Sequence, residues 1–152
     1  MLVQSNTTMN LIRQRLLEIF PNIVPYSEAI PPQSLFFPNF HIQLIQLTIN
    51  RQLSDDLYFV NYFYTIKYRH ANEPTLVTNL AQQLDNVGFA LMTEFKHLVT
   101  PEGVHMRLRD QYYTKADGDL NFFFNLRFLI KKEEVEEVKM QNLHLNIIVL
   151  ER

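Results

Sequence analysis

The five histidines are the side chains best suited to metal binding or proton transfer in this 152-residue sequence. No two of them lie four residues apart with a glutamate between them, which is the spacing of a helical zinc site. A lone histidine on a strand is more often an ordinary half-exposed residue than a ligand. We therefore predict no metal site at these residues, which are His41, His70, His97, His105 and His144.

The other common catalytic patterns are also missing from the sequence. Its three glycines are scattered, so no phosphate-binding loop is present, and no Gly-x-Ser-x-Gly elbow occurs. The absence of cysteine excludes disulfides, thiolate metal ligands and a cysteine nucleophile. We predict no catalytic residues, no cofactor and no enzyme activity. A small enzyme that gathers His105 or His144 with carboxylates is the alternative.

Two charged groups and one aromatic stripe have the composition of binding surfaces. The acidic run within 131–137 suits a metal cluster, but a solvated linker is the more common identity of such a run. Arg107, Arg109 and Arg127 suit a phosphate or an acidic partner, and pairing with nearby carboxylates is the simpler interpretation. The stripe resembles a platform for stacking bases, although alternating aromatics on a strand more often belong to a core. Its residues are Tyr58, Tyr62, Tyr64 and Tyr68.

Composition places the chain among globular proteins. Hydrophobic residues make up 47% of it and charged residues 20%, and its length suits one domain with its own core, residues 1–152. The formal net charge of −2 argues against strong binding to nucleic acid or to an anionic membrane. The first residues lack a basic flank before an apolar run, and no stretch approaches the ~18 apolar residues of a membrane span. We expect no signal peptide and no membrane contact.

The segment Val104–Lys131 is predicted to be a long β-hairpin around which the other elements pack. Its turn is Asp117-Gly118, a strong signal for a type I′ turn, which needs a positive φ at both central residues. The outgoing arm alternates through Leu108 and then loses its apolar pattern, so we expect a tip that projects from the core. The returning arm alternates over its whole length. The residues on its apolar face are Leu120, Phe122, Phe124, Leu126, Phe128 and Ile130.

Two helices are predicted on either side of the first strands. The first covers Thr7–Phe20, with Asn6 or Thr7 as its cap and Pro21 as its end. The second begins at Pro74 and closes at Gly88 in a left-handed conformation. The segment Phe89–Leu98 is ambiguous between helix and strand.

Strand patterns cover most of the remaining chain. A short strand is predicted at Ile23–Tyr26 and a long one at Phe40–Arg51, whose apolar phase switches at Leu44-Ile45. A β-bulge, a strong twist or a change of neighbouring strand halfway along would each cause this switch. A polar turn at Gln52–Asp56 leads to a second long strand, Leu57–Arg69, which forms an antiparallel hairpin with the first. A last strand is predicted at Met140–Leu150. The fold class is therefore α+β, a mostly antiparallel sheet packed against two α-helices, with a long projecting hairpin.

The predicted strands have more apolar surface than two helices can cover. Phe59, Phe63, Phe123 and Leu129 lie on the otherwise polar sides of their strands. We expect oligomerisation to cover part of this surface, and extra helix packing near Phe89–Leu98 is the monomeric alternative.

Several segments together resemble the tail terminator proteins of long-tailed phages and prophages, also called tail completion proteins. The resemblance covers most of the chain and is clearest in the hairpin segment 117–128, whose sequence is DGDLNFFFNLRF. Other matching segments are Ile19-Phe20-Pro21, Tyr26–Ile30, Pro38-Asn39-Phe40 and Met140–Leu143. The long apolar C-terminal strand through Val149 departs from the family pattern.

The resemblance implies an α+β structural protein whose subunits close into a ring, typically a hexamer, on the head-proximal end of the tail tube. Such a ring ends tube polymerisation and offers a docking face to head-completion proteins, while DNA passes through its lumen without specific binding. The implied location is the virion tail at the head–tail interface, after assembly in the cytoplasm of the bacterial host. The implied partners are the chain itself, the tail tube protein and the head-completion, or stopper, protein.

Within this interpretation we place contacts with a neighbouring subunit or the tube at two loops. These residues are Arg51, Asp55 and Asp56 in one turn, and Tyr112, Tyr113, Lys115, Asp117 and Asp119 at the hairpin tip. We predict that acidic residues face the DNA in the lumen. These are Glu133, Glu134, Glu136 and Glu137. A stopper or tail tube subunit is the alternative structural role, and a cellular binding module is a further one.

Overall fold

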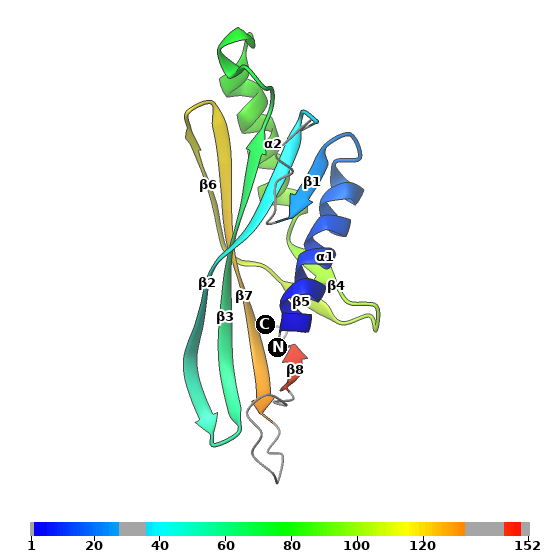
Figure 1. The fold of residues 1–152 in the computed structure, drawn as a ribbon, viewed down its shortest axis with the longest axis vertical. Helices are drawn as coiled ribbons and strands as arrows, with labels where there is room; N and C mark the ends of the chain where they lie inside the picture. The colour runs from blue at the N-terminus through cyan, green and yellow to red at the C-terminus, as the bar shows by residue number, and fades with distance from the viewer. Residues whose placement is uncertain (1, 28–35, 133–144, 150–152) are drawn as a thin grey trace.

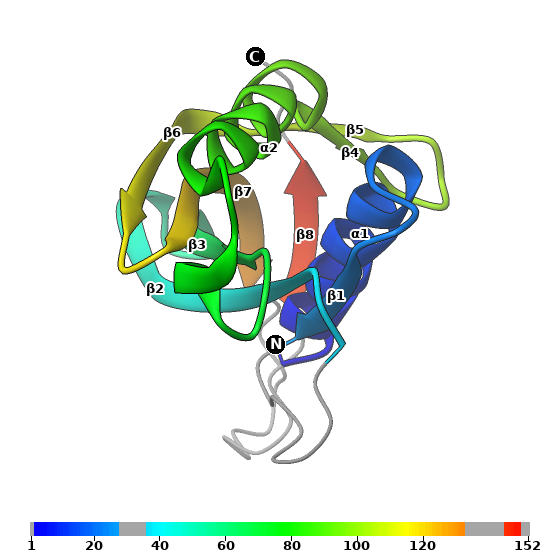
Figure 2. The same cartoon turned by 90° about the horizontal axis from the view of Figure 1, so that it is seen from above.

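The computed structural model describes residues 2–27, 36–132 and 145–149. It contains one six-stranded sheet in the order β1-β2-β3-β7-β6, with β8 also paired to β7, and a separate two-stranded sheet, β4-β5. Figure 1 shows the long twisted sheet beside α1 and α2, and Figure 2 shows both helices on the concave side of that sheet. The prediction of an α+β fold with a mostly antiparallel sheet and two helices is confirmed.

Helix α1, Leu2–Ile19, begins earlier than the sequence predicts. Asn6 and Thr7 lie inside the helix, so their assignment as the cap is wrong. Thr8 is instead buried with the apolar stripe of Met9, Ile12 and Leu16, which packs into the core. The helix ends before Pro21 as predicted.

Strands β1, β2 and β3 follow the predicted pattern closely. Strand β1 (Val24–Ser27) lies parallel to β2 (Asn39–Ser54), which forms an antiparallel hairpin with β3 (Leu57–Arg69). The pairing register of β2 shifts between Leu44 and Gln46, and the phase switch predicted at Leu44-Ile45 is therefore a β-bulge with Ile45 as the extra residue. The turn between β2 and β3 is shorter than predicted, because β2 continues to Ser54.

Helix α2 differs from its prediction at both ends. Pro74 begins a short 3-10 helix, η1 (Pro74–Leu76), and α2 itself covers Leu80–Glu94. Gly88 does not close α2 but lies in its middle, buried against the hairpin. Neither helix among the described residues is long and apolar enough to cross a membrane.

The predicted central hairpin is divided between two sheets. Strand β5 (His105–Arg107) pairs with β4 (His97–Val99), whereas β6 (Arg109–Ala116) pairs with β7 (Asp119–Lys132). The division has a local cause: the Leu108 N–H donates to the Lys96 carbonyl (2.9 Å), and Asp110 adopts a positive φ of 54° at a register shift. The single continuous outgoing arm is therefore a wrong prediction, while the returning arm and turn are confirmed.

Strand β8 (Leu145–Val149) pairs antiparallel with the lower part of β7. It lies within the predicted strand Met140–Leu150, whose other residues are outside the described part of the chain.

The core lies between the concave face of the sheet and the two helices. Alternate residues of β3 and β7 supply its largest share, and Tyr64 and Phe124 stack within it with ring centroids 5.5 Å apart. The tyrosine stripe of β3 is thus core rather than a stacking platform, since Tyr62, Tyr64 and Tyr68 are almost fully buried. The buried residues of the two strands are Val60, Tyr62, Tyr64, Ile66, Tyr68, Leu120, Phe122, Phe124, Leu126 and Phe128.

Candidate functional site

The turn of the β6–β7 hairpin is the best-defined part of the predicted contact surface. Asp117 and Gly118 have φ angles of 54° and 80°, the two positive values that a type I′ turn requires. A Cβ on Gly118 would lie 2.7 Å from the Cβ of Pro74. Glycine is therefore required here both by the backbone angle and by the close approach of η1.

Helix α2 packs against this tip, so the hairpin does not project freely as predicted. Tyr113 donates a hydrogen bond to Asp85 (3.3 Å), and the Lys115 ammonium lies 2.9 Å from the same carboxylate. At Gly88 an added Cβ would lie 2.8 Å from Cζ of Tyr113. The tip was expected to have little to bury against, but the small residue on α2 gives the Tyr113 ring a place to pack.

The five predicted tip residues therefore differ in exposure. Tyr112, Lys115 and Asp117 are exposed, whereas Tyr113 and Asp119 are half-buried. Asp119 forms an ion pair with Lys67 on β3, at 3.5 Å. Three of the five side chains are thus accessible to a partner, and the other two help to hold the tip in place.

The second predicted cluster lies at the opposite end of the sheet. The β2–β3 turn has Ser54 donating to Asp56 (2.8 Å) and Tyr58 donating to the Asp55 carbonyl (3.1 Å). Asp55 is exposed, and Arg51 lies in β2, with its side chain outside the description. Figure 1 shows this turn at the lower end of the sheet and the β6–β7 turn at the upper end, so the fold does not bring the two clusters together.

The remaining predicted sites are also separated or not described. The acidic residues of 133–137 lie outside the described residues, so their prediction as lumen residues remains a prediction. Arg107 belongs to the small sheet and Arg109 to the large one, and the Arg127 guanidinium lies over the Phe59 ring at 5.6 Å. The three arginines therefore do not share one strand, and Arg127 packs on an aromatic ring.

The convex face of the large sheet carries a row of stacked aromatic rings. Tyr112 stacks on Phe123 at 4.8 Å, and Phe123 stacks on Phe63 at 5.8 Å, so the row crosses β6, β7 and β3. The sequence had identified Phe63 and Phe123 as apolar residues on a polar side. In the fold these two are half-buried by each other, while Tyr112 at the end of the row is 48% exposed.

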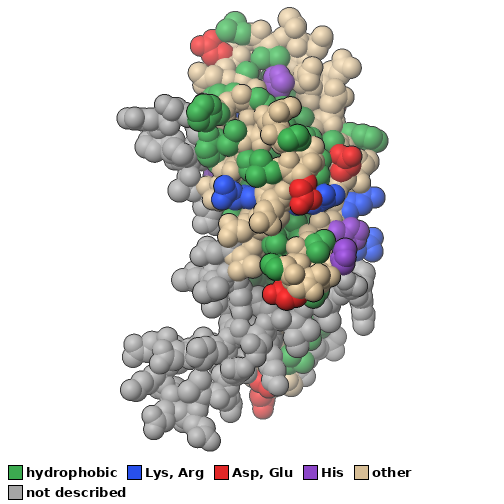
Figure 3. Space-filling model, turned by 90° about the vertical axis from the view of Figure 1, so that its right-hand side faces the viewer, with side chains coloured by type: hydrophobic (Ala, Val, Ile, Leu, Met, Phe, Trp, Pro, Cys, Tyr) green, Lys and Arg blue, Asp and Glu red, His purple; other side chains and the backbone are tan. Residues whose placement is uncertain are grey.

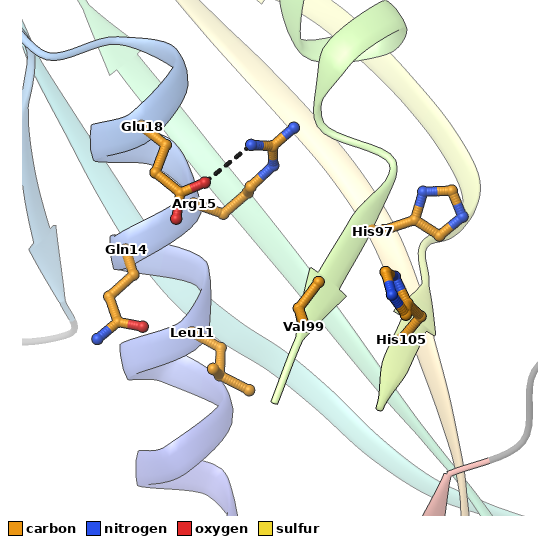
Figure 4. Close-up of a pocket in the computed structure, with 7 residues that line it drawn as sticks. All are labelled: Leu11, Gln14, Arg15, Glu18, His97, Val99 and His105. Atoms are coloured by element: carbon orange, nitrogen blue, oxygen red, sulfur yellow. Dashed lines mark hydrogen bonds and ion pairs between the residues drawn. The ribbon is translucent and has the colours of Figure 1, made fainter. Parts of the chain in front are cut away.

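A groove of about 330 Å³ lies between α1 and the β4–β5 hairpin. Figure 4 shows the Arg15 guanidinium beside the Glu18 carboxylate, with 2.9 Å between the nitrogen and the oxygen. The imidazoles of His97 and His105 lie on the opposite wall of the groove. Arg15 also donates to the Glu94 carbonyl (3.1 Å) and so ties α1 to the end of α2. His97 and His105 lie with ring centroids 6.2 Å apart. No sequence motif indicated this groove, because its residues come from three separate elements.

The chemistry available in the groove is limited. In the described part of the chain, no group of three or more His, Asp or Glu side chains is arranged to hold a metal ion. The groove contains no serine, threonine or lysine that would act as a nucleophile beside the histidines. Figure 3, seen from the side of α1 and the β4–β5 hairpin, shows charged and histidine side chains across the middle of this face, with hydrophobic side chains mainly above them.

Burial changes the acid–base behaviour of two core tyrosines. Desolvation raises the pKa of Tyr68 to about 12 and also raises that of Tyr62. The Tyr68 hydroxyl lies 2.7 Å from Nδ1 of His70. Both tyrosines stay neutral at physiological pH, in keeping with a structural role.

Comparison with protein-family models matches residues 8–138 to the family described as phage tail terminator protein. The match covers most of the chain and includes both long hairpins and α2. A search of curated proteins finds no match.

Proposed function

The chain belongs to the phage tail terminator family and is therefore a structural component of a phage tail, and we propose that it closes the head-proximal end of the tail tube as a ring of identical subunits. In this proposal the ring ends tube polymerisation and gives the head-completion protein a docking face. The family match over residues 8–138 is the observation that carries the proposal.

The character of the described surface supports an assembly role. Apolar side chains are exposed along β2 and at the end of the aromatic row, where Ile45, Ile49 and Tyr112 are 49%, 63% and 48% exposed. Exposed apolar side chains on a sheet edge favour association with another chain. The opposite ends of the long sheet carry different loops, so one molecule has two distinct ends for two different partners.

Within the ring we propose roles for the residues predicted from the sequence. The accessible tip residues Tyr112, Lys115 and Asp117 contact a neighbouring subunit or the tail tube. The β2–β3 turn, with Arg51, Asp55 and Asp56, likewise contacts a neighbouring subunit or the tube from the opposite end of the sheet. Tyr113 and Asp119 position the tip. The glutamates of 133–137 face the lumen, where negative charge keeps the passing DNA from binding. The ring assembles in the cytoplasm of the bacterial host.

The native mass and shape of the purified protein test the ring. Six chains of 18.1 kDa give a hexamer of about 109 kDa, and light scattering should report that mass while negative-stain images show closed rings. Long filaments would contradict the proposal and favour a tube subunit. A stable monomer would contradict a ring that forms before it meets the tube.

A further inference from the structure

The first free edge of the large sheet is the lower part of β2. Strand β1 pairs only with Asn39–Ile42, so β2 has no strand on its outer side from Gln43 to Ser54 within the described residues. Along that edge Ile45, Leu47 and Ile49 are 49%, 41% and 63% exposed. A long edge strand with exposed apolar side chains associates with another chain unless something covers it.

The second free edge is β6. It pairs with β7 on one side, and its other side has no strand partner in the part of the chain that the structure describes. Its exposed aromatic residue is Tyr112, whose side-chain ring stacks on that of Phe123. The side chain is therefore rigid and already oriented, which lowers the entropy cost of a contact.

The exposed residues of the two edges lie at nearly the same height along the strands. Ile45 is the bulged residue between the pairs Leu44–Tyr64 and Gln46–Phe63. On the other side Tyr112 pairs with Phe123, which pairs with Thr65. The two positions therefore differ by one or two residues along β3, a few ångströms at about 3.4 Å per residue.

In a ring whose rotation axis is parallel to these strands, equivalent residues of all subunits lie at the same height, and the strands of all subunits keep the same direction. In such a ring the β2 edge of one subunit faces the β6 edge of the next, and the two strands run antiparallel as they do within a subunit. The contact is heterologous, so each subunit uses both edges. It joins Gln43–Gln46 of β2 to Arg109–Tyr112 of β6, because β2 from Ile49 onward lies at the height of β8 instead.

We propose that Ile45 on β2 packs against Tyr112 on β6 of a second copy of this chain, and that this repeated contact closes the ring. The inference rests on the ring of the proposed function and adds the surfaces that form it. The bulge leaves Ile45 outside the pairing of β2 with β3. Without the bulge, Ile45 would pair with Phe63, the residue that now pairs with Gln46.

Cysteine cross-linking tests the contact directly, because the chain has no cysteine of its own. Neighbouring strands bring Cα atoms within the 4.4–6.8 Å that a disulfide needs. The variants Ile45→Cys and Tyr112→Cys should each remain monomeric on a denaturing gel, and their oxidised mixture should give a covalent dimer. The double variant should give a ladder ending at the number of subunits in the ring. Val99→Cys mixed with Tyr112→Cys is the control, since Val99 is 48% exposed on β4, which belongs to the separate two-stranded sheet.

Charge substitutions provide a second, independent readout. Ile45→Asp or Tyr112→Lys alone should lower the ring fraction at least tenfold by placing a charge against an apolar side chain. Mixing the two should restore rings, because Asp–Lys contacts then alternate with Ile–Tyr contacts around an even-numbered ring. Leu76→Asp, at a residue 74% exposed on η1, should leave the ring fraction unchanged.

The outcomes separate this contact from the proposed function. Rings of the expected mass without a 45–112 cross-link, or a dimer formed by Ile45→Cys alone, would overturn the contact and leave the ring in place. A cross-link that forms only with tail tube protein would identify the tube as the occupant of the edge and would also overturn it. Protein that neither forms rings nor limits tube length would overturn both proposals.

Discussion

Gly88 is the residue at which α2 approaches the hairpin most closely. The sequence predicted it as a helix end, because glycine after an apolar stripe commonly occupies that position. In the fold its missing side chain makes room for the ring of Tyr113 and for Leu120, and a Cβ there would lie 2.8 and 2.9 Å from them. Sequence pattern cannot distinguish these two uses of glycine, since the second depends on a partner 25 residues away.

Gly88→Ala should therefore lower the free energy of unfolding. Overpacking of this kind costs about 1–3 kcal/mol, and the better helix propensity of alanine returns about 1 kcal/mol, so a net loss of about 1 kcal/mol is expected. Urea unfolding monitored by circular dichroism measures it. The same substitution in a Tyr113→Leu background should cost less, because only the close contact with Leu120 then remains. An equal loss of unfolding free energy in both backgrounds would show that the Tyr113 side chain is not the source of the strain.

Tyr68 should make stability fall at alkaline pH. Its pKa in the folded protein is about 12, whereas an unfolded chain loses this proton near 10. Above pH 10 the unfolded state binds fewer protons than the folded state, so the free energy of unfolding decreases as pH rises from about 10 to 12. Tyr68→Phe should show a shallower decrease between about pH 10 and 12 in urea titrations. An unchanged slope in this variant would show that Tyr68 is not the source of the decrease.

At the scale of elements, packing rather than charge should hold the hairpin tip on α2. The Lys115–Asp85 pair is exposed, with 38% and 48% of the two side chains accessible, and exposed pairs contribute about 0–1 kcal/mol. A double-mutant cycle with Lys115→Met and Asp85→Asn should give a coupling energy below about 1 kcal/mol that decreases in high salt. A salt-insensitive coupling of several kcal/mol would contradict this account.

The elements that the sequence predicted well are those with an unbroken local pattern. Strand β3 and the returning arm β7 alternate over their whole lengths, and the phase switch at Leu44-Ile45 marks the place of the β2 bulge, although a strong twist or a change of neighbouring strand would have given the same pattern. The outgoing arm was predicted incorrectly because the alternation through Met106 and Leu108 continues across the change of sheet. That change depends on a hydrogen bond to Lys96 and on the backbone of Asp110, neither of which has a sequence signal.

At the scale of the whole molecule, the predicted contact residues fall at two opposite ends of the sheet. Sequence order alone could identify the turns but not their separation, because the pairing of β3 with β7 decides which end each turn occupies. The groove between α1 and the small sheet had no sequence signal at all. The resemblance to the terminator family was predicted from structural segments, and the family match confirms it.

The length of tail tubes grown with this protein is the most direct test of the central claim. The matching tail tube protein would be polymerised alone and with increasing amounts of the terminator, and tube lengths would be measured by electron microscopy. The account predicts that tubes become shorter as the ratio of terminator to tube protein rises, with one ring at a single end of each tube. Unchanged tube lengths, with no ring at either end, would contradict it.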